Sequence, residues 1–232
     1  MVKPQSFQAK VAEHIELNKK YHSLRLELVD PHQLEFAAGQ YISVAIGGAA
    51  RRAYSIASTP ATKHAVELLV DIEPGGKGST FMKNLKPGDA VEFLAPLGIF
   101  TVATEPKLLF VATGSGIAPF KSMLFDLLED KKDQREIWLL WGLRQVEEMF
   151  WEEEWRQINE YYANFHYRLM ISKPPGMWPL VSGHVDKELN DVALNQDWGV
   201  YLCGNKEMIA EVSQMVQNRG VDINKIYKEG YA

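Results

Sequence analysis

The chain has 232 residues, 46% of them hydrophobic and 24% charged, which suits one large or two modest globular domains and argues against a disordered chain. A net charge of -5 argues against general nucleic-acid binding, and no apolar run of about 18 residues could span a bilayer. The start of the chain lacks the apolar core of a signal peptide, so we expect a cytoplasmic protein. The single Cys203 excludes an internal disulfide and an all-cysteine iron–sulfur cluster held by this chain alone. Because the six histidines lack metal-ligand spacing, we expect no metal site.

The first hundred residues carry short segments in which polar and apolar side chains alternate. This alternation, with β-branched and aromatic residues at intervals, indicates strands that bury one face. The segments are 7–17, 22–29, 41–46, 66–72 and 90–94. Because no long helical pattern separates them, we predict an all-β antiparallel barrel, closed or nearly closed, over residues 1–103.

A cation, an aromatic ring and a hydroxyl stand close together in the segment 51–58, within this predicted barrel. Side chains two positions apart on a strand share a face, so Arg52 and Tyr54 should project together, with Ser55 on the other face. A guanidinium matches a pair of pyrophosphate oxygens, and a tyrosine ring offers a stacking surface. A flavin with a diphosphate tail has both features, although an ordinary barrel strand with a surface arginine would show the same pattern.

A glycine-rich turn at 74–80 precedes a short helical pattern at 81–85. A helix that starts here, with Ser79 or Thr80 as its cap, would present unpaired backbone N–H groups to a phosphate. A flexible connection with a capped helix is the plainer interpretation. Together with Arg52, however, the turn could bind the second phosphate of a dinucleotide.

After residue 103 the pattern changes to buried strands that alternate with helices. The predicted strands are 107–112, 136–141, 165–171 and 199–203. The first predicted helix has Pro119 in its first turn and runs to about residue 130, and further helices are predicted at 147–161, 185–189 and 206–218. This alternation predicts an α/β domain with a doubly wound parallel sheet over residues 104–232. Ligands of such sheets bind at the carboxyl ends of the strands.

Four strand ends of this domain carry small or polar residues that suit a ligand site. They are Thr113, Gly114 and Gly116 after the first strand, 142–144 with Arg144 after the second, Ser172 and Lys173 after the third, and Cys203 and Gly204 after the fourth. Each could be a plain turn, but four together at one edge favour a shared crevice. The first turn is not the three-glycine dinucleotide motif, because Pro119 stands where a third small residue would help packing.

The order of these motifs resembles the ferredoxin–NADP reductase family of FAD flavoproteins over nearly the whole chain. The motifs are 39–41, Arg52-Ala53-Tyr54-Ser55, Gly78-Ser79-Thr80, 113–119 and 203–205. The resemblance implies that the segment Arg52 to Ser55 binds FAD. Arg52 would hold the pyrophosphate, Tyr54 would lie against the isoalloxazine, and Ser55 would bond near its reactive nitrogen. Gly78, Ser79 and Thr80 would bind phosphate.

The same resemblance implies a site for the nicotinamide dinucleotide at residues 114–119, with Cys203 and Gly204 beside the nicotinamide. The implied chemistry is hydride transfer from NADPH or NADH to FAD, and then transfer of single electrons to a separate carrier. Ferredoxin or flavodoxin is the expected partner, and we expect a monomer that binds neither nucleic acid nor membrane.

Three other functions fit the same motifs. They are a free-flavin reductase, the reductase component of an oxygenase, and a nucleotide-sensing flavoprotein scaffold without turnover. The resemblance implies that free-flavin reductases usually lack the second phosphate loop, so the loop 78–80 favours tightly bound FAD.

The choice between NADPH and NADH depends on cations near the end of the third strand of the second domain. Lys173 follows Ser172 at this strand end, and His184 comes later in the segment after it. Arg144 stands at the end of the preceding strand. Lysine lacks the bidentate fork of arginine. We therefore expect a modest preference for NADPH.

The end of the chain carries a carboxylate, Glu229, and an aromatic ring, Tyr231. A chain end is by default a frayed segment, but the strand-like stretch 224–227 would deliver both side chains to the sheet edge. The resemblance implies that the aromatic packs on the flavin face opposite Tyr54, where it would gate the nicotinamide. The predicted catalytic residues are therefore Ser55, Cys203, Glu229 and Tyr231.

Overall fold

The computed structural model describes residues 3–176, 182–185 and 187–230. The chain divides into two compact units, Met1–Val102 with Ala118–Lys132 and Ala103–Ile117 with Asp133–Ala232. The sheet of the first unit is antiparallel and that of the second is parallel. The predicted fold class, an antiparallel barrel followed by a parallel α/β domain, is confirmed.

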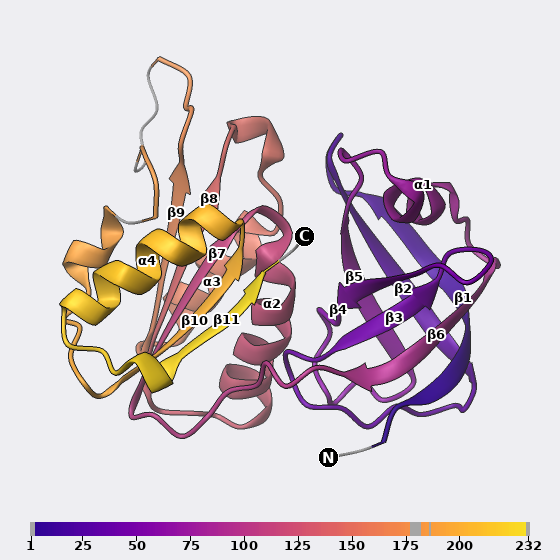
Figure 1. Ribbon diagram of the computed structural model, residues 1–232, viewed down its shortest axis with the longest axis horizontal. Coiled ribbons are helices and arrows are strands. Elements are labelled where there is room, and N and C mark those ends of the chain that lie inside the picture. The colour runs from indigo at the N-terminus through magenta and orange to yellow at the C-terminus, as the bar shows by residue number, and fades with distance from the viewer. Residues whose placement is uncertain (1–2, 177–181, 186, 231–232) are drawn as a thin grey trace. The chain divides into compact units, whose positions relative to one another are not determined.

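The first unit is a nearly closed barrel. Its strands are β1 (Gln5–Glu16), β2 (Tyr21–Asp30), β3 (Tyr41–Ala45), β4 (Arg51–Ser55), β5 (Ala65–Asp71) and β6 (Ala90–Leu97), in the order β4-β3-β6-β1-β2-β5 (Figure 1). Just after β4, Ile56 pairs with Leu68 of β5, and the Ala57 amide donates to the Glu67 carbonyl at 2.8 Å. These contacts connect the two edge strands of the sheet.

Inward-facing side chains fill the barrel, and buried positions alternate with more accessible ones along β3 and the first half of β1. On β3, Ile42 and Val44 are fully buried, while Tyr41, Ser43 and Ala45 are partly exposed. Phe7 of β1 and Phe93 of β6 stack with ring centroids 5.4 Å apart. The alternation predicted from the sequence therefore corresponds to the two faces of β1 and β3, whereas β5 is buried at most of its positions.

Helix α2 (Ile117–Phe125), which continues into a π-helical turn (Asp126–Asp130), packs on the barrel. The Ser122 hydroxyl donates to the Ser58 carbonyl at 2.7 Å, and Lys121 pairs with Glu67 at 3.3 Å. The sequence pattern predicts that residues 118–132 belong to the second domain. In the structure their contacts are with the first unit.

Two histidines on neighbouring barrel strands connect to the end of helix α1 (Lys77–Asn84). His14 Nδ1 lies 2.7 Å from the Leu85 carbonyl, and His14 Nε2 lies 2.7 Å from His22 Nδ1. A carbonyl only accepts, so neutral His14 must donate from Nδ1 and accept from His22 at Nε2. Burial lowers the pKa of His22, the charges of His14 and Lys83 lower it further, and Glu16 opposes them.

This histidine pair should make the protein less stable as the pH falls below about 6.5, the pKa of an unperturbed histidine. The unfolded chain then takes up a proton that folded His22 resists, so unfolding gains at most about 1.4 kcal/mol per pH unit from this group. His22→Asn keeps a donor near His14 but cannot titrate. Urea unfolding at pH 7.5 and 5.5 should show a smaller loss in this variant than in the wild type, and equal losses would contradict the assignment.

The second unit is built on a parallel sheet. Its strands are β7 (Lys107–Thr113), β8 (Glu136–Leu143), β9 (Phe165–Ile171), β10 (Trp198–Gly204) and β11 (Ile226–Gly230), in the order β11-β10-β7-β8-β9. All neighbouring pairs run parallel. The carboxyl ends of these strands therefore lie at one edge of the sheet.

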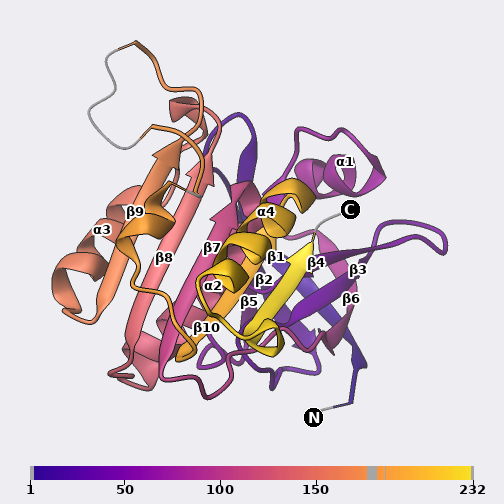
Figure 2. The ribbon, with the colours of Figure 1, turned by 60° about the vertical axis from the view of Figure 1, so that its left-hand side comes forward.

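Helices cover both faces of this sheet. Helix α4 (Lys206–Asn218) packs against β10 and β11, and its Met208 shares a core with Met170 of β9 (Figures 1 and 2). Helix α3 (Glu152–Tyr161) places Trp155 against Phe165 and Tyr167, which alternate with Met170 along β9. Since alternate residues of a strand face opposite sides, α3 and α4 lie on opposite faces.

Three predicted boundaries in this unit are wrong. Helix α3 begins at Glu152 and not at 147, because Met149 is extended and Trp151 has a left-handed φ of 53°. A 3₁₀ turn covers Glu188–Asp191 where a helix at 185–189 was predicted. The last strand begins at Ile226, after a 3₁₀ turn at Ile223–Lys225, and runs on through Gly230.

No helix among the described residues is long and apolar enough to cross a membrane.

Candidate functional site

Strand β4 and the first turn of α1 meet in the first unit. A Cβ atom on Gly78 would lie 2.7 Å from Arg52 Cγ and 3.0 Å from the Tyr54 hydroxyl. Only a glycine lets the helix approach these two side chains so closely. The predicted residues Arg52, Tyr54 and Gly78 thus lie together, and Arg52 and Tyr54 share a face as expected.

The two arginines of β4 differ in what they contact. Arg51 donates to the Ser43 carbonyl at 2.9 Å and pairs with Glu92 at 3.5 Å. Arg52 is exposed and donates from Nη1 to the Arg51 carbonyl at 2.9 Å. A guanidinium has five N–H donors, so Arg52 keeps capacity to bind an anion.

The other residues of the segment differ in exposure. Ala53 is exposed, Tyr54 is half-buried and Ser55 is 5% exposed. Burial raises the pKa of Tyr54 to about 12, although the charge of Arg52 opposes this shift. Tyr54 therefore stays a neutral phenol at physiological pH, with an apolar ring and a hydroxyl that can donate.

The start of helix α1 differs from the prediction in its cap. Gly76 occupies the N-cap, so the prediction that Ser79 or Thr80 caps the helix is wrong. The Ser79 hydroxyl donates to the Gly76 carbonyl at 3.1 Å, and the Thr80 hydroxyl donates to the Gly75 carbonyl at 3.3 Å. The Thr80 amide donates to the Gly76 carbonyl. The amides of the helical residues before Thr80 are therefore the groups that this helix start offers to a phosphate.

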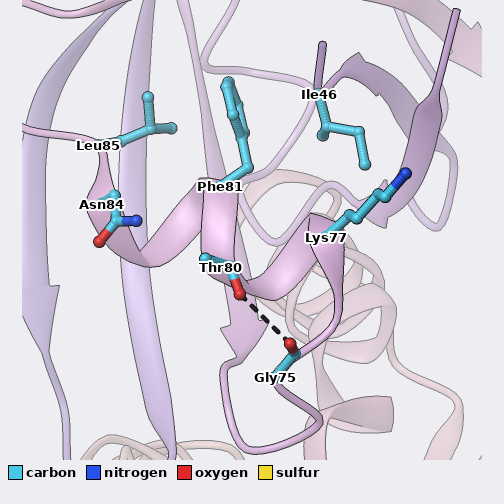
Figure 3. A pocket seen from close by; sticks show the side chains of 7 residues that line it. All are labelled: Ile46, Gly75, Lys77, Thr80, Phe81, Asn84 and Leu85. Carbon is cyan, nitrogen blue, oxygen red and sulfur yellow. Dashed lines mark hydrogen bonds between the residues drawn. The ribbon is translucent and has the colours of Figure 1, made fainter. Parts of the chain in front are cut away.

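An open cavity of about 600 Å³ lies beside this helix start (Figure 3). Its lining combines apolar side chains with polar ones: Ile46, Gly75, Lys77, Thr80, Phe81, Asn84 and Leu85. Figure 3 shows the bond between Thr80 and Gly75 at its edge. Sequence reasoning missed this cavity, because Ile46, which follows β3, is far in the sequence from the other lining residues.

The end of β7 and the end of β10 approach closely in the second unit. A Cβ on Gly116 would overlap the Cys203 carbonyl oxygen and lie 2.6 Å from the carbonyl carbon. Gly204, at φ 142°, is equally crowded by Thr113, whose hydroxyl oxygen accepts from the Asn205 amide at 3.0 Å. These predicted residues therefore form one compact backbone-lined site.

The turn after β7 is held by a tryptophan that sequence reasoning did not single out. Trp141 Nε1 donates to the Gly114 carbonyl at 3.1 Å, and Gly114 has a φ of 55°. Pro119 is the third residue of the helix that follows. Asn205 caps helix α4 by accepting from the Met208 amide at 2.7 Å, which an Asn just before a helical pattern could have indicated.

The ends of β8 and β9 bring the backbones of the two predicted cations, Arg144 and Lys173, together. The Lys173 amide donates to the Arg144 carbonyl at 2.8 Å, and the Ser172 amide donates to Leu143 at 2.9 Å. Glu148 accepts from the Arg144 amide at 3.2 Å, which also places a carboxylate here. The positive charge available to a phosphate at this edge is therefore partly offset.

Strand β11 brings Glu229 beside Cys203. The two residues are partners in the parallel register, and Gly204 is the partner of Gly230. Cys203 is fully buried and Glu229 is partly exposed. Tyr231, the predicted gate, lies outside the described residues.

Comparison with known proteins agrees with this geometry. The family model described as the oxidoreductase FAD-binding domain matches residues 8–102, and the oxidoreductase NAD-binding domain matches residues 110–214. The chain is also 28% identical over 244 aligned positions, and over the full length of both chains, to ferredoxin–NADP reductase B of Sorangium cellulosum. The chain belongs to the ferredoxin–NADP reductase family.

Other proteins that the chain resembles are named for different partners. The chain is 35% identical over 224 residues to the phenol hydroxylase P5 protein of Acinetobacter pittii, covering 93% of this chain and 63% of that one. The crystal structure of the Amycolatopsis cytochrome P450 reductase GcoB matches with a TM-score of 0.90 and 26% identity, over 99% of this chain and 71% of that one. The chain spans about half the length of other curated relatives that it matches.

As a ferredoxin–NADP reductase family member, the chain is an oxidoreductase that binds FAD and a nicotinamide dinucleotide. The described residues fit both ligands. Gly78, which has no side chain, lets the start of helix α1 come close to Arg52 and Tyr54, and Gly116 lets the turn after β7 come against the end of β10. At both positions a Cβ atom would collide with the neighbouring residues, so a side chain there would push the helix start or the turn away from them.

Proposed function

We propose that the chain is a reductase that moves electrons between NAD(P)H and a one-electron carrier, ferredoxin or flavodoxin, with residues 1–103 as the FAD domain and 104–232 as the NAD(P) domain. The contact of Gly78 with both Arg52 and Tyr54 carries the proposal, because it builds an anion site beside a stacking ring. When bound, FAD accepts a hydride and releases electrons singly.

In this proposal each unit binds one ligand. In the first unit, Arg52 and the first-turn amides of α1 hold the FAD pyrophosphate, with Ser79 and Thr80 shaping the turn. The neutral Tyr54 ring lies along the isoalloxazine, and Ser55 and Ala53 lie on the same strand. These residues orient the flavin and exclude water from it.

Residues 113–119 receive the dinucleotide phosphates, and Cys203 and Gly204 of the second unit lie beside the nicotinamide. Glu229 lies next to Cys203 in register, where its carboxylate can hold a proton near the site. Lys173 and Arg144 lie where a 2′-phosphate would bind. Since Glu148 also lies there, we expect only a modest preference for NADPH.

A second candidate function is the reductase component of an oxygenase. The similarity to the phenol hydroxylase P5 protein and to a cytochrome P450 reductase favours it. Both functions use the same two ligands, so they differ in the protein that takes the electrons. Exposed Lys77 and Lys83 on α1 suit an acidic protein acceptor in either case.

The purified protein should be yellow with FAD, and anaerobic NADPH should bleach its spectrum at least as fast as NADH. It should then reduce ferricyanide, and reduce ferredoxin or flavodoxin at a rate that falls as salt screens the lysines. If the protein reduces ferricyanide and an oxygenase component but reduces neither ferredoxin nor flavodoxin, the second function is the correct one. Extracted FMN, or no bleaching, would contradict both.

A further inference from the structure

A buried carboxylate lies at the base of the parallel sheet. Glu105 precedes β7 and is 7% exposed. It accepts from the Tyr227 hydroxyl at 2.6 Å and from the Tyr201 hydroxyl at 3.2 Å. Gly199 makes room for it, because a Cβ there would lie 2.8 Å from Glu105 Oε2.

The backbone of Glu105 is fixed from the other side by Arg135. The Arg135 guanidinium donates to the carbonyls of Ala103 and Glu105 at 3.0 and 3.1 Å, and it pairs with Asp133 at 2.6 Å. The Ala103 amide donates to the Tyr201 hydroxyl at 2.9 Å. These hydrogen bonds therefore fix the position of the Glu105 carboxylate in the sheet.

Strand β11 needs a fixed contact of this kind to set its register against β10. It has five residues and lies at the sheet edge, paired with β10 alone among the described strands. A slip of one residue would turn its side chains to the opposite face, and a slip of two would move Glu229 about 7 Å from its place opposite Cys203. Ile226 anchors one face of the strand in the core.

Tyr227 anchors the other face with a directional hydrogen bond. Its ring stacks on Tyr201 with centroids 4.7 Å apart, and its hydroxyl reaches Glu105. Burial and then Glu105 raise the pKa of Tyr227 to about 12, so it remains a donor. An apolar residue in place of Glu105 would avoid the desolvation of a charge but would accept no hydrogen bond.

We propose that Glu105 is a positioning residue: through Tyr227 it fixes the register of β11 and so holds Glu229 opposite Cys203. The inference rests on the proposed function in one respect, that Cys203 and Glu229 lie beside the nicotinamide. Glu105 acts on the reaction through strand β11 and does not touch the site itself. It lies beside Gly199 of β10, and Cys203 comes later on the same strand.

The test compares three variants of the FAD-loaded protein. Tyr227→Phe keeps the stacked ring and removes the donor, and Glu105→Gln weakens the acceptor. Tyr201→Phe is the matched control, because it removes the other phenol bound to Glu105 from a strand that is paired on both sides. Amide hydrogen exchange is measured by peptide, and flavin reduction by NADPH is measured by stopped flow.

We expect amides 226–230 to exchange faster in Tyr227→Phe and Glu105→Gln and to be unchanged in Tyr201→Phe. Flavin reduction should slow by roughly 10- to 100-fold in the first two, with the apparent affinity for NADPH within about twofold, since small misplacement of a reacting group has effects of this size. Their double variant should be no worse than the worse single one.

Unchanged exchange of 226–230 in Tyr227→Phe would overturn the positioning role. So would a loss of rate shared equally by Tyr201→Phe. Glu229→Gln separates the two proposals: if it reduces flavin at the wild-type rate while the exchange result holds, the register role stands and the proposed role of Glu229 beside the nicotinamide fails.

Discussion

Arg52→Ala should purify with little FAD and should bind added FAD about 10- to 100-fold more weakly than the wild type. Hydrogen bonds to charged groups contribute about 1.5–3 kcal/mol each, and about 1.4 kcal/mol is a tenfold change in affinity. Arg52 is exposed on β4, and its stem contacts the helix start at Gly78. Quenching of FAD fluorescence during titration of the stripped protein measures the constant.

Arg51→Ala is the control for this prediction. Arg51 is the adjacent arginine, but its guanidinium is engaged by the Ser43 carbonyl and by Glu92. The control should keep its FAD through dialysis. If Arg52→Ala also keeps full occupancy, or if both variants lose FAD equally, Arg52 does not hold the pyrophosphate.

The sequence predicts the barrel and most of the parallel sheet, because both depend on local periodicity. Alternation on β3 corresponds to buried Ile42 and Val44, and the continuous apolar run of β7 corresponds to a central strand. The shared face of Arg52 and Tyr54 follows from the same period of two. Local pattern alone is sufficient for these features.

Local pattern fails where a single backbone angle or a distant contact decides the structure. The acidic residues after 146 favour a helix start, yet Trp151 adopts a left-handed φ and the helix begins one residue later. The bonds from Ser122 to Ser58 and from Tyr227 to Glu105 join residues 64 and 122 positions apart. No short motif encodes such pairs, so α2 on the barrel and the Glu105 cluster could not be predicted.

Gly116→Ala should abolish most of the reduction of bound FAD by NADPH, by a factor of roughly 100 or more, while FAD stays bound to the barrel. A methyl group there would overlap the Cys203 carbonyl oxygen and lie 2.9 Å from the Gly204 nitrogen. Both atoms belong to the end of β10. This strand is paired with β7 and β11, so it cannot shift without disturbing both pairings. The turn must therefore move away from the strand end, and the proposed dinucleotide site opens.

Gly176→Ala is the control, since a Cβ there meets nothing within 4 Å and its φ is not positive. Overpacking at Gly116 should also destabilise the protein by about 1–3 kcal/mol, so circular dichroism and FAD content must first show that the variant is folded. Stopped-flow reduction by NADPH then decides the matter. A folded Gly116→Ala protein that reduces its flavin as fast as Gly176→Ala would show that the nucleotide does not depend on the approach of this turn to β10.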